Sequence, residues 1–181
     1  GIRNEMPHET YLELAAWYQD VNRLQDARQV LELAPPNGEV LYWLAFLQDA
    51  LGDSAAAETL RKAEAASPRL VFPFRSESVP VFEWAMRQTT TWRPKYYLAL
   101  ILWSRNEVAR ARDLLLSCGA SPDFAPFYAA RGKAFETASR DASLADLLRA
   151  AQIDPREWRF GKALIERHVE DYDDAYIPFL M

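Results

Sequence analysis

An apolar residue followed by a small one recurs at five places along this 181-residue chain. The small residues are Ala15, Ala45, Ala99, Ala130 and Gly161, and those before them are Leu14, Leu44, Leu98, Ala129 and Phe160. Twelve residues after the first four small positions come Ala27, Ala57, Ala111 and Ala142. Two helices approach closely only where both carry small side chains, so this register predicts a series of helix pairs that cross at these positions.

Residues that end helices stand at fixed places in the same register. Asn22, Gly52 and Asn106 come seven residues after small positions, and both residue types tolerate the left-handed backbone of a helix end. A proline then closes each complete unit, at Pro35, Pro68, Pro122 and Pro155. Each unit is therefore expected to contain a helix, a tight turn and a second helix.

The apolar residues recur at the three- and four-residue spacing of helices, and only 6 glycines occur. We therefore expect an all-α fold of about eleven helices. Their expected ranges are 9–20, 24–34, 38–51, 54–66, 78–89, 95–104, 107–117, 124–136, 141–152, 156–168 and 172 onward.

The pattern of small residues, turn residues and prolines resembles the tetratricopeptide repeat (TPR) family. Its best-matching positions are Leu44, Ala45, Gly52, Asp53, Ala57 and Pro68, followed by Leu98, Ala99, Asn106, Ala111 and Pro122. The resemblance implies a single domain over 1–181, an α-solenoid of helix hairpins in a right-handed superhelix. Its units are expected at about 8–36, 37–69, 93–122, 123–155 and 156–181, the last one partial, with an insertion at 70–92.

The insertion, VFPFRSESVPVFEW from Val71, combines an extended stretch that contains prolines with a helix. We expect the helix to pack as an extra one. Arg75 and Glu77 either pin the extended part through a charge pair or take part in recognition. Together with KYYLAL, FYAAR and Trp158-Arg159, the insertion is also similar to the C-terminal helical segment of large bacterial proteins that have an uncharacterised β-rich N-terminal domain. That likeness implies an intramolecular or carbohydrate-related context.

The charge balance argues against nucleic acid as a partner, because 21 basic and 26 acidic side chains give a net charge of −5. No apolar run is long enough to span a bilayer, so we expect a soluble protein, with the cytoplasm favoured. The chain begins at Gly1 and not at Met, so we expect a fragment of something longer.

Residues for chemistry are sparse, and we expect no enzyme, cofactor or metal site. The single cysteine, Cys118, is expected in the core, and His8 on the solvated surface. His168 is expected to favour a helix end. An acidic cluster at Glu170, Asp171, Asp173 and Asp174 lacks the central glycine and terminal glutamate of a calcium-binding EF-hand loop.

Aromatic residues recur three residues before the small positions, where the sequence has Leu12, Tyr42, Tyr96, Phe127 and Trp158. In the TPR family this place lies on the concave face. The resemblance therefore implies a partner-binding groove, lined by Tyr42, Phe46, Tyr96, Trp103, Phe127, Arg131, Trp158, Arg159 and Lys162. Two alternatives remain open, that the rings pack helix against helix and that they stack on sugars.

These features favour a non-catalytic protein-interaction or intramolecular scaffold module, which binds a peptide or a neighbouring domain on its concave face. The alternative is an accessory helical domain of a larger carbohydrate-active or other enzyme, whose catalytic residues lie outside this chain. The sequence does not identify the partner or the oligomeric state.

Overall fold

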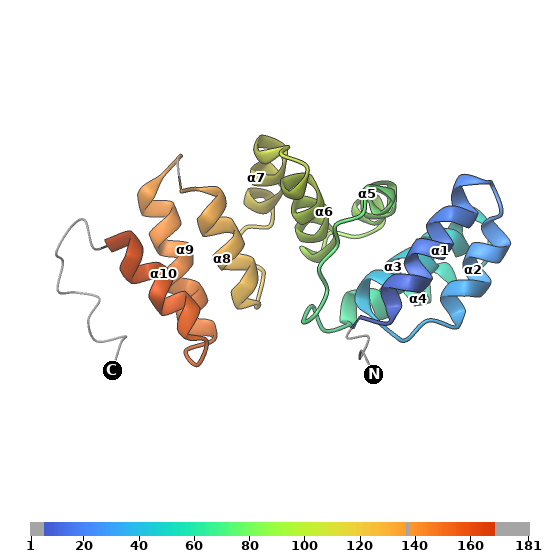
Figure 1. Ribbon diagram of the computed structural model, residues 1–181, viewed down its shortest axis with the longest axis horizontal. Helices are drawn as coiled ribbons and strands as arrows, with labels where there is room; N and C mark the ends of the chain where they lie inside the picture. Colours follow the sequence, from blue (N-terminus) through green and yellow to red (C-terminus); the bar gives the residue numbers. More distant parts are fainter. Residues whose placement is uncertain (1–5, 137, 169–181) are drawn as a thin grey trace. The chain divides into compact units, whose positions relative to one another are not determined.

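A computed structural model describes residues 6–136 and 138–168, and within them the chain forms helices and no strand (Figure 1). The helices are α1 (His8–Asp20), α2 (Leu24–Glu32), α3 (Gly38–Ala50), α4 (Ala56–Ala65), the short 3-10 helix η1 (Ser76–Ser78), α5 (Val79–Gln88), α6 (Arg93–Ser104), α7 (Val108–Ser117), α8 (Ala125–Ala134), α9 (Arg140–Ile153) and α10 (Trp158–His168). The all-α prediction is confirmed, because the first ten predicted helices all occur with ends within about two residues. The eleventh, from 172 onward, lies outside the described residues, as does the acidic cluster that follows α10.

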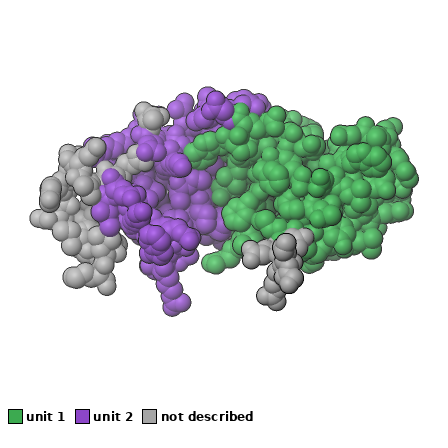
Figure 2. Space-filling model, in the orientation of Figure 1, with its two compact units in different colours: residues 1–105 green, residues 106–181 purple. Residues whose placement is uncertain are grey.

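The chain forms two compact units, Gly1–Arg105 and Asn106–Met181 (Figure 2). The division falls inside the expected repeat 93–122, so the helices of that repeat belong to different units. A single continuous domain therefore stays a prediction.

In unit 1, α1 packs against α2 and α3 packs against α4, and α2 joins the two hairpins by contacting α3. Helix α5 packs against both α3 and α6. The insertion therefore supplies an extra helix, as predicted, and Phe82 and Val81 of that helix are fully buried.

In unit 2, α7 packs against α8, α8 against α9 and α9 against α10. The core includes Leu115, Phe127, Leu147 and Leu164, and it also takes in Cys118, which confirms the expectation that this thiol is buried.

The predicted turn residues adopt the expected backbone. The φ angles of Asn22, Gly52 and Asn106 are +59°, +71° and +65°, so each lies in the left-handed region. Asparagine and glycine carry the smallest penalty there, which explains why these types mark the ends of α1, α3 and α6.

Most of the predicted crossing positions are buried, but Ala57 is not. Ala15, Ala27, Ala45 and Ala99 are fully buried, and Ala111 is almost fully buried. In the hairpin of α3 and α4, Ala56 is buried in place of the exposed Ala57. These helices are joined by residues 51–55, whereas three residues join α1 to α2 and α6 to α7, so the twelve-residue spacing does not hold in this hairpin.

In the pair α8–α9 the closest approach lies at Gly132 and not at Ala130. A Cβ atom on Gly132 would lie 3.0 Å from the backbone oxygen of Ser143 and 3.3 Å from the side chains of Asp146 and Leu147. Ser143 is fully buried, whereas Ala142 is half-buried. The small pair of this hairpin is therefore Gly132 and Ser143.

Candidate functional site

Three of the predicted groove aromatics are core residues. Tyr42 and Phe127 are fully buried, and Tyr96 is nearly so. The Tyr42 ring packs edge-on to Phe82 and Tyr97, with centroid separations of 5.6 and 6.0 Å. Such ring clusters stabilise a core through area and quadrupole geometry. The packing alternative therefore describes these three residues, and their place in a partner groove is corrected.

The face of α3 that was expected to meet a partner is covered by the inserted segment. Phe46 packs on Trp84, with centroids 5.8 Å apart, and the Trp84 indole N–H donates a 2.8 Å hydrogen bond to Asp49. At the start of α3, the Ser78 hydroxyl donates a 2.7 Å bond to Glu39. The chain thus fills this surface with its own η1 and α5.

A buried polar network anchors the insertion at Ser78. The Trp43 indole N–H donates to the Ser78 oxygen at 2.9 Å, while the Ser78 hydroxyl donates to Glu39, and all three residues are buried. Burial raises the pKa of the Glu39 carboxyl to about 7, although the bond from Ser78 opposes this shift. Glu39 therefore ionises near neutral pH.

A charge pair holds the extended part of the insertion in place, which agrees with the first of the two roles that the sequence suggested for Arg75. The Arg75 guanidinium contacts the Glu9 carboxylate of α1 at 3.0 Å, and both side chains are mostly buried. Glu77 is exposed and accepts a bond from Ser76. Arg75 therefore stabilises the loop.

Arg131 is held by its own unit and is not a cation available to a partner. Its guanidinium makes two 2.7 Å hydrogen bonds with Asp146 of α9 and lies over the rings of Phe127 and Tyr128. The bonds to Asp146 raise the pKa of Arg131 further. Its predicted place in the lining of a partner groove is therefore corrected to a structural role.

The remaining predicted residues lie at or near the surface. Trp103 of α6 is half-buried, while Trp158, Arg159 and Lys162 of α10 are exposed. Both cations of α10 lie 5.9 Å from the Trp158 ring centroid, and each also pairs with a carboxylate of its own helix or the turn before it, Glu157 or Glu166. Trp103 and the α10 residues belong to different units, and their joint groove stays a prediction.

The sequence predicted an extended stretch from Val71, but not that the apolar loop formed by residues 69–74 of unit 1 would expose large apolar side chains. Leu70, Phe72 and Phe74 are 71%, 56% and 54% exposed, while Val71 and Pro73 between them are buried. From Val71 to Phe74 this alternation indicates a nearly extended chain that presents every second side chain to solvent, whereas Leu70 lies in the turn before it. The letters LVFPF carry that signal, because a short apolar run with a proline is typical of an extended segment and not of a helix.

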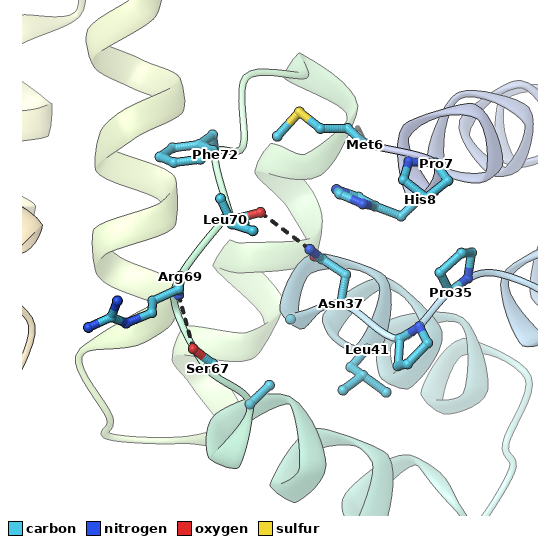
Figure 3. A pocket seen from close by; sticks show the side chains of 13 residues that line it. Met6, Pro7, His8, Pro35, Asn37, Leu41, Ser67, Arg69, Leu70 and Phe72 are labelled. Carbon is cyan, nitrogen blue, oxygen red and sulfur yellow. Dashed lines mark hydrogen bonds between the residues drawn. The ribbon is translucent and has the colours of Figure 1, made fainter. Parts of the chain in front are cut away.

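A pocket of about 810 Å³ lies beside this loop (Figure 3). Its walls come from the start of α1, the joint before α3, the end of α4 and the loop itself, and consist of Met6, Pro7, His8, Pro35, Pro36, Asn37, Gly38, Leu41, Ala66, Ser67, Arg69, Leu70 and Phe72. His8 is buried here and was wrongly expected on the surface, and its Nε2 atom lies 3.5 Å from a Glu9 carboxylate oxygen.

Asn37, one of the pocket residues, links helix α3 to the apolar loop. Its side-chain oxygen accepts a 2.8 Å bond from the Glu39 N–H and caps α3, and its amide nitrogen lies 3.5 Å from the Leu70 carbonyl oxygen. Figure 3 shows Asn37 and His8 on one side of the loop, and Arg69 and Phe72 on the other. All four residues line the pocket, so the loop forms part of its wall.

Comparison with solved structures identifies the fold. YrrB, described as a TPR protein with an unusual peptide-binding site, aligns with a TM-score of 0.51 and 15% identity over 98% of this chain and 84% of that one. A double mutant of MamA RS-1 aligns with a TM-score of 0.51 and 15% identity over 96% of this chain and 90% of that one. The chain has a tetratricopeptide-like fold.

TTC0263, a TPR protein of Thermus thermophilus, aligns less well, with a TM-score of 0.44 and 19% identity over 90% of this chain and 99% of that one. No known family model and no curated protein matches the sequence of this TPR-like chain.

Among the described residues, no three His, Cys, Asp or Glu side chains gather as a group that could hold a metal ion. None of the described helices is long and apolar enough to cross a membrane.

Proposed function

We propose that this chain is a non-catalytic protein-interaction module, which binds an apolar segment of a partner at the pocket and apolar loop of unit 1. One observation carries the proposal: three large apolar side chains, Leu70, Phe72 and Phe74, are exposed on one short loop beside a pocket of about 810 Å³. Contiguous exposed apolar surface of this kind is typical of interaction sites, because leaving it in water costs free energy.

The chemistry of the pocket supports binding over catalysis. Among the described residues, the ionisable side chains that line it are His8 and Arg69, and His8 lies 3.5 Å from Glu9. The one hydroxyl among these lining residues is that of Ser67, just after α4. An acid–base enzyme needs a positioned pair of such groups. The partner can be a separate protein, a peptide or a neighbouring domain of the same polypeptide.

The test is a selection of random dodecapeptides displayed on phage against the full chain. Peptides that bind the wild type are expected to lose binding to Phe72→Ser, because this change removes an exposed ring and leaves the core intact. Trp158→Ser in α10 is the matched control, since Trp158 is a comparably exposed aromatic residue at 65%. Peptides that keep their affinity for Phe72→Ser but lose it for Trp158→Ser would contradict the proposal.

A further inference from the structure

Leu70 holds an unusual backbone conformation for its side chain. Its φ angle is +59°, in the left-handed region that disfavours residues with a Cβ atom, and glycine or asparagine fills the equivalent role at Asn22, Gly52, Asn106 and Gly119. Leu70 is also 71% exposed, so it gains little burial in exchange. Folding alone would favour glycine here, so an apolar contact outside the chain would account for the leucine.

The charges around the loop favour an anionic group on that contact. Among the described residues no carboxylate lines the pocket, and the two ionisable ones that do, His8 and Arg69, are both basic types. Arg69 is exposed, and no described residue forms a hydrogen bond or ion pair with its guanidinium. Figure 3 shows Arg69 and Phe72 projecting to the same side of the loop.

We infer that the partner is a peptide segment with two or more apolar side chains and a carboxylate close to them, which contacts Leu70 and Phe72 and pairs with Arg69. This inference rests on the proposed function and specifies the ligand of that site. An exposed guanidinium with no partner among the described residues can form a charge-assisted, two-pronged bond with a carboxylate while the apolar side chains exclude water around it.

A lipid surface is the other macromolecule that exposed Leu and Phe side chains can meet. Within residues 69–74, all of which the structure describes, Arg69 is the one cation, and the net charge of −5 repels anionic headgroups, so the observations favour the peptide. Vesicles of phosphatidylcholine with phosphatidylserine test the lipid directly.

The experiment repeats the dodecapeptide selection on the full wild-type chain, on Arg69→Glu and on Leu70→Gly. Wild type should enrich peptides with apolar residues flanked by Asp or Glu, and Arg69→Glu should enrich the same apolar pattern flanked by Lys or Arg. Leu70→Gly should bind the wild-type peptides about tenfold more weakly or worse. Its melting temperature should be unchanged or higher, because glycine fits the left-handed backbone.

The outcomes distinguish the proposed interaction site from the inferred chemistry of its ligand. Peptides that bind at Phe72 without any charge preference, or equally well to Arg69→Glu, overturn the carboxylate inference and leave the interaction module standing. Loss of binding by Leu70→Gly together with a lower melting temperature overturns the assignment of Leu70 as a contact residue. Failure to enrich any peptide, with co-sedimentation of the chain on vesicles that Phe72→Ser abolishes, overturns both.

Discussion

The hairpin α3–α4 in unit 1 and the hairpin α8–α9 in unit 2 use equivalent positions of the repeat differently. In α3 the positions predicted to face a partner are covered by an inserted helix, through Phe46–Trp84 and Asp49–Trp84. In α8 no insertion follows, and Arg131 is held by an ion pair with Asp146 of the next helix. In both hairpins the chain itself therefore supplies the contacts at these positions. Aromatic rings and a buried polar network supply them in unit 1, and an ion pair supplies them in unit 2.

The difference explains where exposed apolar surface remains. To bring α5 onto α3, the chain leaves α4 and runs through residues 69–74, and this connection carries Leu70, Phe72 and Phe74 on its outer side. In unit 2 the connection that follows the hairpin α8–α9 consists of residues 154–157 only and has no such stretch. The insertion thus covers one face of α3 and, in residues 69–74, exposes a new apolar surface.

The largest expected effect is on the charge pair of unit 2. Asp146→Ala should lower the free energy of unfolding by about 3 kcal/mol, because it leaves the guanidinium of Arg131 mostly buried without its partner. Urea unfolding followed by circular dichroism measures this change. Arg159→Ala, which removes an exposed ion pair, should change the stability by less than about 0.5 kcal/mol, and equal effects of the two changes would refute the structural role of Arg131.

The buried carboxyl of unit 1 should make stability depend on pH in the opposite sense to an ordinary salt bridge. Between the usual glutamate pKa of 4.5 and the raised pKa of about 7 at Glu39, the folded chain keeps a proton that the unfolded chain has lost. The contribution of Glu39 to stability is therefore full below pH 4.5 and falls as pH rises to 7, by about 3 kcal/mol at most.

Glu39→Gln should remove this pH dependence, because glutamine does not ionise. The measurement compares urea unfolding of wild type and Glu39→Gln at pH 5 and pH 8, so that all other titrating groups cancel. The wild type should lose more stability than the variant over that interval. Parallel losses in the two proteins would show that Glu39 ionises freely in the fold.

The close approach of α8 and α9 should resist any added volume. Gly132→Ala places a Cβ atom against the Ser143 backbone oxygen, which cannot move aside as a flexible side chain would, and should cost about 1 to 3 kcal/mol. Thermal unfolding monitored by circular dichroism checks this value. Lys133→Ala, at the exposed neighbour, is the control, and a neutral Gly132→Ala would mean that these helices are further apart than described.

The smallest effect tests the corrected register in unit 1. Ala57→Leu should change stability by less than about 0.5 kcal/mol because Ala57 is exposed, whereas Ala45→Leu should cost about 1 to 3 kcal/mol by overpacking a fully buried position. Chemical denaturation of both variants gives the comparison. A large loss with Ala57→Leu would restore the register read from the sequence.

The helices and their turns were predictable because their signals are local. The three- and four-residue apolar spacing sets where each helix lies, and Asn22, Gly52 and Asn106 mark left-handed ends that few other residue types tolerate. The crossing positions depend on how two helices are joined, and across residues 51–55 the buried alanine of α4 is Ala56 and not Ala57.

The site was less predictable because it depends on which parts of the chain meet. Nothing in the sequence around Arg131 shows that Asp146 pairs with it, and nothing around Tyr42 shows that Phe82 of the insertion covers it. The pattern identified positions that need a contact, and only the structure shows that the chain itself supplies most of these contacts. The apolar loop was present in the letters LVFPF, but the repeat register gave it no role.

Hydrogen exchange of the full chain, followed by mass spectrometry with and without a peptide enriched on the wild type, tests the central claim most directly. Binding at the pocket should slow exchange of backbone amides in residues 67–74 and at the start of α3, and leave α10 unchanged. Protection confined to α10, around Trp158 and Lys162, with no change in residues 67–74, would contradict the account.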